Sequence, residues 1–142
     1  MTLIKSISGI RGTIGGQISE NLTPIDIVKF TTAYGIWNRK QGLSNNKIVV
    51  GRDARLSGQM VENIVVSTLA SLGFEVINIG MATTPTTEMA VILEKAAGGI
   101  IITASHNPAS YNGIKVFVKD GRDADVDFTD KLEAYIEKIE KI

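Results

Sequence analysis

The sequence has no cysteine among its 142 residues, which excludes disulfide bonds, thiolate chemistry and zinc–thiolate sites. An excess of one charge is also missing, because 15 Lys and Arg balance 15 Asp and Glu. A neutral chain has no overall attraction for nucleic acid or for an anionic membrane surface. No apolar run approaches the length of a membrane span, and the N-terminus lacks the pattern of a signal peptide. These absences predict a cytoplasmic protein without a nucleic-acid or membrane partner.

Apolar residues make up 44% of the chain and recur with clear periodicity, which indicates a globular domain. We expect one domain over residues 1–142. Helical spacing or helix-start signals predict helices over 23–42, 57–73 and 84–96, and a last helix that Thr129 caps and that carries Leu132, Ile136 and Ile139. Predicted strands cover 47–50, 74–79, 100–102 and 113–118.

This alternation of helices and strands predicts an α/β fold of three layers, αβα, around a mostly parallel mixed sheet of about four to five strands. The connection over 103–112 is too short for a crossover helix, which favours an antiparallel strand after it. Thr23 and Pro24 are typical of a helix start, and Ser57 is the expected cap of the next helix. The stripe formed by Phe30, Tyr34 and Trp37 is expected in the core rather than on a stacking surface.

Glycines are frequent in residues 5–20, where the sequence reads KSISGIRGTIGGQISE. Two interpretations stay open for this segment: a flexible N-terminal arm, or a backbone that approaches a ligand closely. The segment is not a dinucleotide-binding fingerprint, because it lacks G-x-G-x-x-G and no buried strand precedes it.

The most informative stretch runs from the apolar residues 100–102 into a polar loop that contains Ser105, His106 and Asn107. Pro108 disfavours a helical conformation at Asn107, so we expect an extended loop. Open α/β sheets place reactive groups at the carboxyl ends of buried strands. We therefore interpret Ser105 as a carrier of a phosphoryl group.

Three cations from separate segments, Arg11, Arg52 and Lys115, would form an anion site if they met near this serine. A lysine that is buried or lies beside other cations can serve as a general acid–base, which is the role expected of Lys115. A surface ion pair with Asp53 is the alternative for Arg52.

Other readings of these residues are less favoured. In an extended backbone Ser105 and His106 would point to opposite sides, which argues against a nucleophile–base pair. No G-x-S-x-G elbow surrounds Ser105, which argues against an acyl hydrolase. The acidic loop 120–127 lacks the calcium-loop pattern and is expected to be a solvated turn.

Three motifs resemble those of the α-D-phosphohexomutases and occur in the same order along the chain as in that family, which includes phosphoglucomutase, phosphomannomutase and phosphoglucosamine mutase. TASHNP at 103–108, followed by NGIK at 112–115, is similar to the phosphoserine loop of that family. SGIRG at 8–12 and GRDARLSG at 51–58 resemble two further motifs. The similarity therefore spans most of the chain.

The resemblance implies roles for single residues. Ser105 would be the phosphorylated serine and, through its phosphate, a ligand of Mg²⁺. Lys115 would be the general acid–base, and His106 and Arg11 would lie beside the phosphate or the sugar. Ser8, Arg52 and Asn107 are the remaining residues expected to contact phosphate or substrate.

The family converts hexose 1-phosphates and 6-phosphates, of glucosamine, mannose or glucose, through a hexose bisphosphate. Its members are longer four-domain enzymes, and the metal loop of three aspartates in their second domain has no counterpart here. The chain therefore resembles the first domain alone, as a fragment with the remaining domains as partners. We expect no mutase turnover from it with hexose phosphate and Mg²⁺. A non-catalytic module that binds phosphate or phosphosugar is the alternative.

Overall fold

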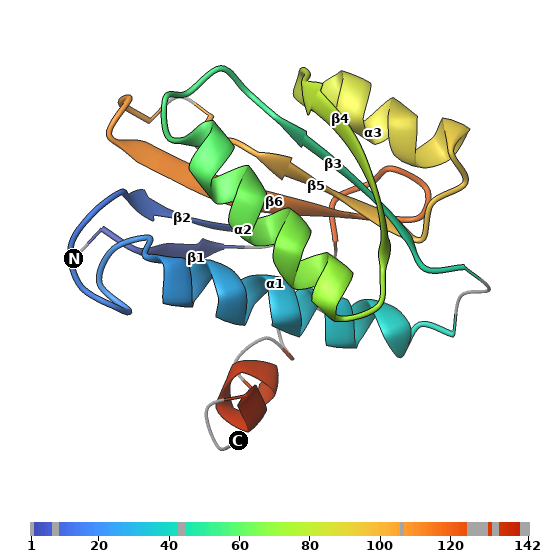
Figure 1. Cartoon of the computed structure of the whole chain (residues 1–142), viewed down its shortest axis with the longest axis horizontal. Helices are drawn as coiled ribbons and strands as arrows, with labels where there is room; N and C mark the ends of the chain where they lie inside the picture. Colours follow the sequence, from blue (N-terminus) through green and yellow to red (C-terminus); the bar gives the residue numbers. More distant parts are fainter. Residues whose placement is uncertain are drawn as a thin grey trace.

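The computed structural model describes residues 2–6, 9–42, 45–105, 107–124, 131 and 134–139 (Figure 1). Its elements in chain order are β1 (Ile4–Ser6), β2 (Gly9–Thr13), α1 (Pro24–Arg39), β3 (Lys47–Arg52), α2 (Gly58–Ser71), β4 (Glu75–Met81), α3 (Thr84–Leu93), β5 (Gly98–Ile102) and β6 (Tyr111–Val118). Residues 134–139 are also helical, whereas Thr129 and Leu132 of the predicted last helix lie outside the described residues.

The strands form one mixed sheet in the order β1-β2-β6-β5-β3-β4. β3 pairs in parallel with both β4 and β5. β6 runs antiparallel to β5, as the short connection predicts, and β2 runs antiparallel to both β6 and β1. The three-layer α/β prediction is confirmed, but the described sheet has six strands instead of four to five. The three strand pairs among β1, β2, β6 and β5 are antiparallel, and only the two pairs made by β3 are parallel.

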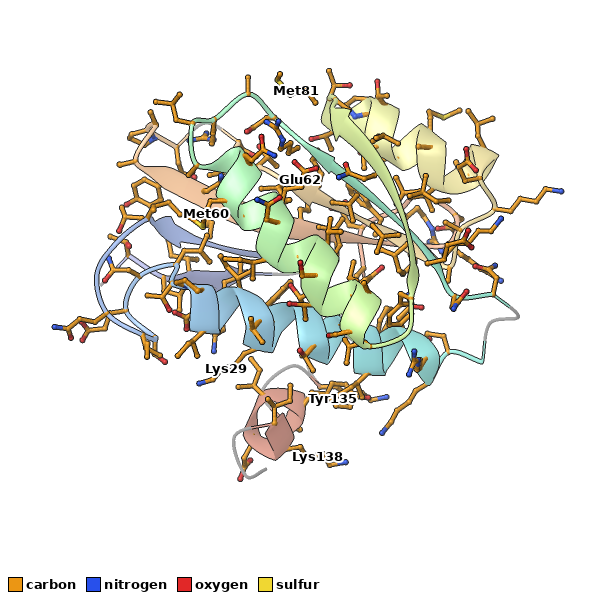
Figure 2. The ribbon with its side chains drawn as sticks, in the orientation of Figure 1. Lys29, Met60, Glu62, Met81, Tyr135 and Lys138 are labelled. Atoms are coloured by element: carbon orange, nitrogen blue, oxygen red, sulfur yellow. The ribbon has the colours of Figure 1, made fainter. Side chains whose placement is uncertain are left out.

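Helices cover both faces of this sheet. Side chains of α1, α2 and the helical residues 134–139 pack with Ile48 and Val50 of β3 into one large core. Val49 points the opposite way, as strand alternation requires, and packs with Val91 of α3. Figure 2 places Tyr135 beside α1, where the Lys40 ammonium lies 5.2 Å from the centre of its ring.

The glycine-rich N-terminal segment is not a flexible arm. Residues 9–13 form β2, which is hydrogen-bonded on one side to β1 and on the other to β6. Ile10 is buried in the larger core and anchors the strand there. Short glycine-rich strands carry little local signal, because their pairing partners lie far away in the sequence.

The helix predictions hold with two corrections. The Thr23 hydroxyl accepts a hydrogen bond from the Asp26 amide, and the Asp26 carboxylate accepts one from the Thr23 amide, so α1 begins with a capping box. Ser57 precedes α2 without a capping hydrogen bond from its side chain; its hydroxyl accepts instead from the Asn112 amide group at 2.9 Å. α3 ends at Leu93, before the predicted end at Ala96, and Lys95 has a left-handed φ of 53°.

The aromatic stripe of α1 lies in the core, as predicted. The Tyr34 hydroxyl donates a hydrogen bond of 2.7 Å to the Phe117 carbonyl, which ties α1 to β6. Burial raises the pKa of Tyr34 well above its usual value, so the hydroxyl keeps the proton that it donates. Within the described part of the chain, no helix is both long and apolar enough to cross a membrane.

A polar network links β3, α2 and β4 beneath the edge of the sheet. Arg52 Nε donates to Glu62 Oε2 over 2.5 Å, and these side chains are 17% and 8% exposed. The side-chain amide of Asn78 donates to the other oxygen of Glu62. Figure 2 labels Glu62 on α2, one turn into the helix. A carboxylate this buried needs its cation, because an uncompensated charge in the interior is costly.

Replacing Arg52 by Met is therefore expected to lower the free energy of unfolding by about 3 kcal/mol, since Glu62 would lose its cation. Urea denaturation of the variant measures this loss. Arg122→Met is the matched control, because Arg122 is 80% exposed in its pair with Asp120; it should change stability by less than about 0.5 kcal/mol. Equal effects of the two substitutions would contradict a structural role for the Arg52–Glu62 pair.

Candidate active site

The site forms where the end of β5, the following strand β6 and the distant N-terminal strand β2 meet. Ser105 follows the end of β5, Lys115 lies within β6, and Arg11 lies within β2. β6 pairs with both other strands: Gly9 is opposite Lys115, and Arg11 is opposite Gly113. Because residues two apart in a strand share a face, Arg11 and Lys115 project from the same face of the sheet.

A cavity of about 170 Å³ joins these residues. It is lined by Gly9, Ile10, Arg11, Thr103, Ala104, Ser105, Ile114, Lys115 and Asp123. Lys115 Nζ lies 3.3 Å from Asp123 Oδ2 at its rim, with the lysine side chain 39% exposed. Within the described part of the chain, Arg11 Nε is buried and has no hydrogen-bond partner. A buried cationic donor without a partner is suited to an anion that enters the cavity.

Gly113 allows the strands to approach each other at this point. A Cβ atom there would lie 2.6 Å from the Ile10 carbonyl oxygen and 2.8 Å from both Arg11 Cβ and the Thr103 carbonyl oxygen. Any side chain at 113 would therefore push β2 or the end of β5 away from β6. The glycine keeps Arg11 close to the segment that carries Ser105.

The serine loop, which we define as residues 103–110, is a pair of turns and not the extended segment that Pro108 suggested. The Asn107 amide donates to the Ala104 carbonyl at 3.0 Å, and the Tyr111 amide donates to the Pro108 carbonyl at 2.9 Å. Ser105 itself is exposed and has a left-handed φ of 52°. The argument from an extended backbone against a Ser105–His106 pair therefore does not hold, and His106 lies outside the described residues.

The left-handed conformation at Ser105 is unusual for a residue with a side chain and costs about 1–3 kcal/mol. Such a conformation persists only where surrounding contacts enforce it. Here the Ser105 amide donates to Thr103 Oγ1 at 3.1 Å, and the Ser105 carbonyl accepts from Arg55 at 2.9 Å. The serine is thus held from both sides of its Cα atom.

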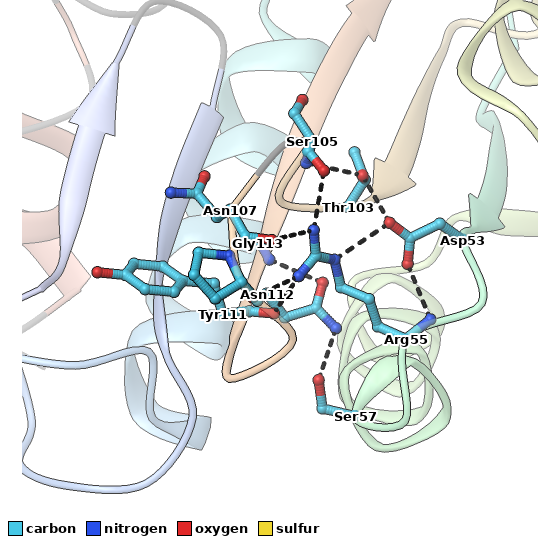
Figure 3. A network of polar contacts seen from close by, with 10 residues as sticks. Asp53, Arg55, Ser57, Thr103, Ser105, Asn107, Tyr111, Asn112 and Gly113 are labelled. Carbon is cyan, nitrogen blue, oxygen red and sulfur yellow. Dashed lines mark hydrogen bonds and ion pairs between the residues drawn. The ribbon is translucent and has the colours of Figure 1, made fainter.

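Arg55 and Asp53 supply most of this support, and neither was among the site residues expected from the sequence (Figure 3). The Arg55 guanidinium reaches beneath the serine loop and donates to its backbone carbonyls. Asp53 Oδ2 accepts from Thr103 Oγ1 at 2.7 Å and from Arg55 Nε at 3.3 Å. At the end of the loop, Asn112 is fully buried and donates to Ser57, which ties β6 to the start of α2.

The other expected site residues lie elsewhere or outside the description. Arg52 is paired with Glu62 and does not line the cavity. Asn107 contributes its backbone to the serine loop, and it also does not line the cavity. Ser8 and His106 lie outside the described residues.

The acidic loop 120–127, expected to be a solvated turn, is only partly exposed: Asp120, Arg122 and Asp123 are exposed, whereas Gly121 and Ala124 are buried. Residues 125–127 lie outside the description. Although slight burial acts to raise it, hydrogen bonds from Arg122 hold the pKa of Asp120 below its usual value. No group of three or more His, Cys, Asp or Glu side chains suited to a metal ion occurs among the described residues.

Residues 3–142 match the family described as phosphoglucomutase/phosphomannomutase, alpha/beta/alpha domain I. The chain is 48% identical over 112 residues to the phosphoglucosamine/phosphogalactosamine mutase of Sulfurisphaera tokodaii, an alignment that covers 78% of the chain and 24% of that protein. It is 37% identical over 144 residues to the phosphoglucosamine mutase of Latilactobacillus sakei subsp. sakei, which covers the whole chain and 31% of that protein.

The fold comparison agrees with the sequence comparison. A crystal structure of a phosphoglucomutase/phosphomannomutase family protein from Burkholderia thailandensis superposes with a TM-score of 0.79 at 27% identity, over 94% of this chain and 30% of that one. The chain thus spans between about a quarter and a third of the length of these relatives. Because its domain match covers nearly every residue, the chain belongs to the phosphoglucomutase/phosphomannomutase family, in which it corresponds to α/β/α domain I.

Proposed function

We propose that this chain is the phosphoserine-bearing part of a phosphohexomutase, which interconverts the 1-phosphate and 6-phosphate of a hexose through a bisphosphate. The observation that carries the proposal is the convergence of Ser105, Arg11 and Lys115 on one small cavity. The names of the relatives, which are phosphoglucosamine mutase, phosphoglucosamine/phosphogalactosamine mutase and phosphoglucomutase/phosphomannomutase, support a hexose phosphate as the substrate. The proposed sugar is glucosamine, mannose or glucose.

In the proposed reaction the phosphoryl group starts on Ser105 Oγ. A hydroxyl oxygen of the bound hexose phosphate attacks the phosphorus, its new O–P bond forms, and the bond between phosphorus and Ser105 Oγ breaks. Ser105 Oγ gains a proton from the Lys115 ammonium group, and the proton that the sugar hydroxyl loses passes to the Lys115 amine and restores that ammonium group. The resulting hexose bisphosphate then returns its other phosphoryl group to Ser105 by the reverse steps.

Lys115 is the proposed general acid–base, because it lines the same cavity as Ser105. It would protonate Ser105 Oγ as the phosphoryl group leaves and accept the proton again on return. Arg11 would compensate the charge of the phosphoryl group, using the buried Nε donor that has no partner among the described residues. Contacts of Ser8, His106 and Asn107 with phosphate or sugar remain part of this proposal.

The resemblance also implies Mg²⁺. The described residues do not by themselves form a site for it, since no carboxylate cluster is present among them. The phosphate on Ser105 would be one ligand, and the other ligands would come from the parts of the protein that this chain does not span. Turnover would likewise require those parts, so we expect the 142-residue chain alone to be inactive.

The phosphoserine proposal predicts that the complete protein containing this chain takes up a single phosphoryl group on Ser105 when it is incubated with a hexose 1,6-bisphosphate. Intact-mass analysis before and after addition of hexose phosphate should show the adduct and its discharge. Ser105→Ala should abolish both the adduct and turnover, because the other hydroxyl among the described lining residues, that of Thr103, is already bonded to Asp53 and to the amide of residue 105.

Ser110→Ala is the matched control, since Ser110 is an exposed hydroxyl in the same loop and does not line the cavity. It should leave the adduct and the turnover unchanged. A protein that interconverts hexose phosphates without any adduct would contradict the proposal. A protein that binds phosphosugar with neither adduct nor turnover would support the non-catalytic binding module instead.

The acid–base proposal predicts that Lys115→Met lowers kcat of the complete protein by about 10²–10⁴-fold, because the proton carrier is lost. Lys115→Arg should be nearly as slow, since a guanidinium keeps its proton at any working pH. Lys119→Met, an exposed lysine in the turn after β6, serves as the control and should change kcat less than about twofold. Full activity of Lys115→Arg would show that only the positive charge matters.

A further inference from the structure

The Arg55 side chain uses all of its hydrogen-bonding capacity on the protein itself. A guanidinium has five N–H donors, and each of the five has an acceptor here. Nε donates to Asp53 at 3.3 Å. Nη1 donates to the carbonyls of Pro108 at 2.7 Å and Tyr111 at 3.0 Å, and Nη2 donates to those of Ser105 and Asn107, both at 2.9 Å.

Three backbone carbonyls of the serine loop and that of Tyr111, the first residue of β6, thus point toward one cation. Carbonyl oxygens that converge in this way repel each other unless a cation or several donors lie between them. The side chain of Arg55 is 12% exposed, so water has little access to replace it. The shape of the loop therefore depends on this guanidinium.

Asp53 extends the same support to the other side of Ser105. Its Oδ2 atom accepts from Thr103 Oγ1 at 2.7 Å, and Thr103 Oγ1 accepts from the Ser105 amide at 3.1 Å. Its Oδ1 atom accepts from the Arg55 amide at 3.2 Å. The backbone of Ser105 is held at its amide through Asp53 and Thr103 and at its carbonyl by Arg55, which accounts for the left-handed φ.

We propose that Arg55 and Asp53 are positioning residues of the phosphoryl transfer. They fix the backbone of Ser105 so that its hydroxyl opens toward Arg11 and Lys115, and they do not contact the substrate. This inference rests on the proposed role of Ser105. Arg55 has no N–H group left for a phosphate, whereas Arg11 has a buried one without a partner among the described residues.

Arg55→Lys in the complete protein tests the inference. A lysine keeps the charge but has three donors at a single point, so it cannot reach four carbonyls and Asp53 together. Displacing the serine by about 1 Å is enough to slow transfer about 100-fold, so kcat should fall by that factor. KM should stay within about threefold, because the substrate contacts remain. Amide hydrogen exchange should accelerate in residues 103–111 and stay unchanged in α1.

Arg122→Lys is the control, since the side chain of this exposed arginine bonds only to Asp120 among the described residues, and it should alter neither kcat nor exchange. Asp53→Asn is a second variant in case Arg55→Lys folds poorly. The asparagine side chain keeps one oxygen that can accept a hydrogen bond but loses the negative charge. A smaller drop in kcat, about tenfold, is therefore expected, with KM unchanged.

Three results would overturn the inference. One is unchanged kcat and unchanged exchange in Arg55→Lys. Another is a kcat that falls only in proportion to the folded fraction, measured by thermal unfolding. The third is a large rise in KM at constant kcat, which would make Arg55 a substrate ligand. If the complete protein without substitutions takes up no phosphoryl group, the proposed function fails. Amide hydrogen exchange in residues 103–111 of Arg55→Lys still decides whether Arg55 holds the loop.

Discussion

The antiparallel return of β6 between β5 and β2 is the constraint on which the site depends. β5 delivers Ser105 at its carboxyl end, and β6 turns back at once beside it, carrying Lys115. β2 can then pair with the free edge of β6 and bring Arg11 within reach of both. A parallel strand after β5 would need a crossover helix, which would separate the lysine from the serine. The helical layers hold this arrangement, as the bond from Tyr34 to the Phe117 carbonyl illustrates.

Features with a local cause could be predicted from the sequence. The capping box at Thr23 and Asp26, the apolar runs of β3 and β5, and the short connection that makes β6 antiparallel all act over a few residues. The strands β1 and β2 could not be predicted in this way, because β2 pairs with β6, about 100 positions later in the chain, and β1 in turn pairs with β2. Ser57 shows the same limit, since its hydroxyl bonds to distant Asn112 instead of capping its own helix.

The candidate site was predicted in part for the same reason. Ser105, Arg11 and Lys115 do line one cavity, as residue type and motif indicated, although the strand that carries Arg11 was not predicted. Arg52 does not line the cavity, and strand alternation could have indicated this. Arg52 follows Ile48 and Val50 at steps of two in β3, so its side chain lies on the face that α2 covers. Its guanidinium consequently meets Glu62 of that helix. The conformation of the serine loop had no such signal, because it depends on tertiary contacts with Arg55.

The three arginines of the two N-terminal motifs show how position decides what one residue type does. Arg52 ends a strand and points into a helical layer, so it neutralises a buried carboxylate. Arg55 lies three residues further, beyond the sheet, where four backbone carbonyls and the Asp53 carboxylate accept from all five of its donors. Arg11 lies within a strand on the face that opens to the cavity, with a buried donor that no described group satisfies. An incoming anion can gain most from the last of these, because its hydrogen bond replaces no existing one.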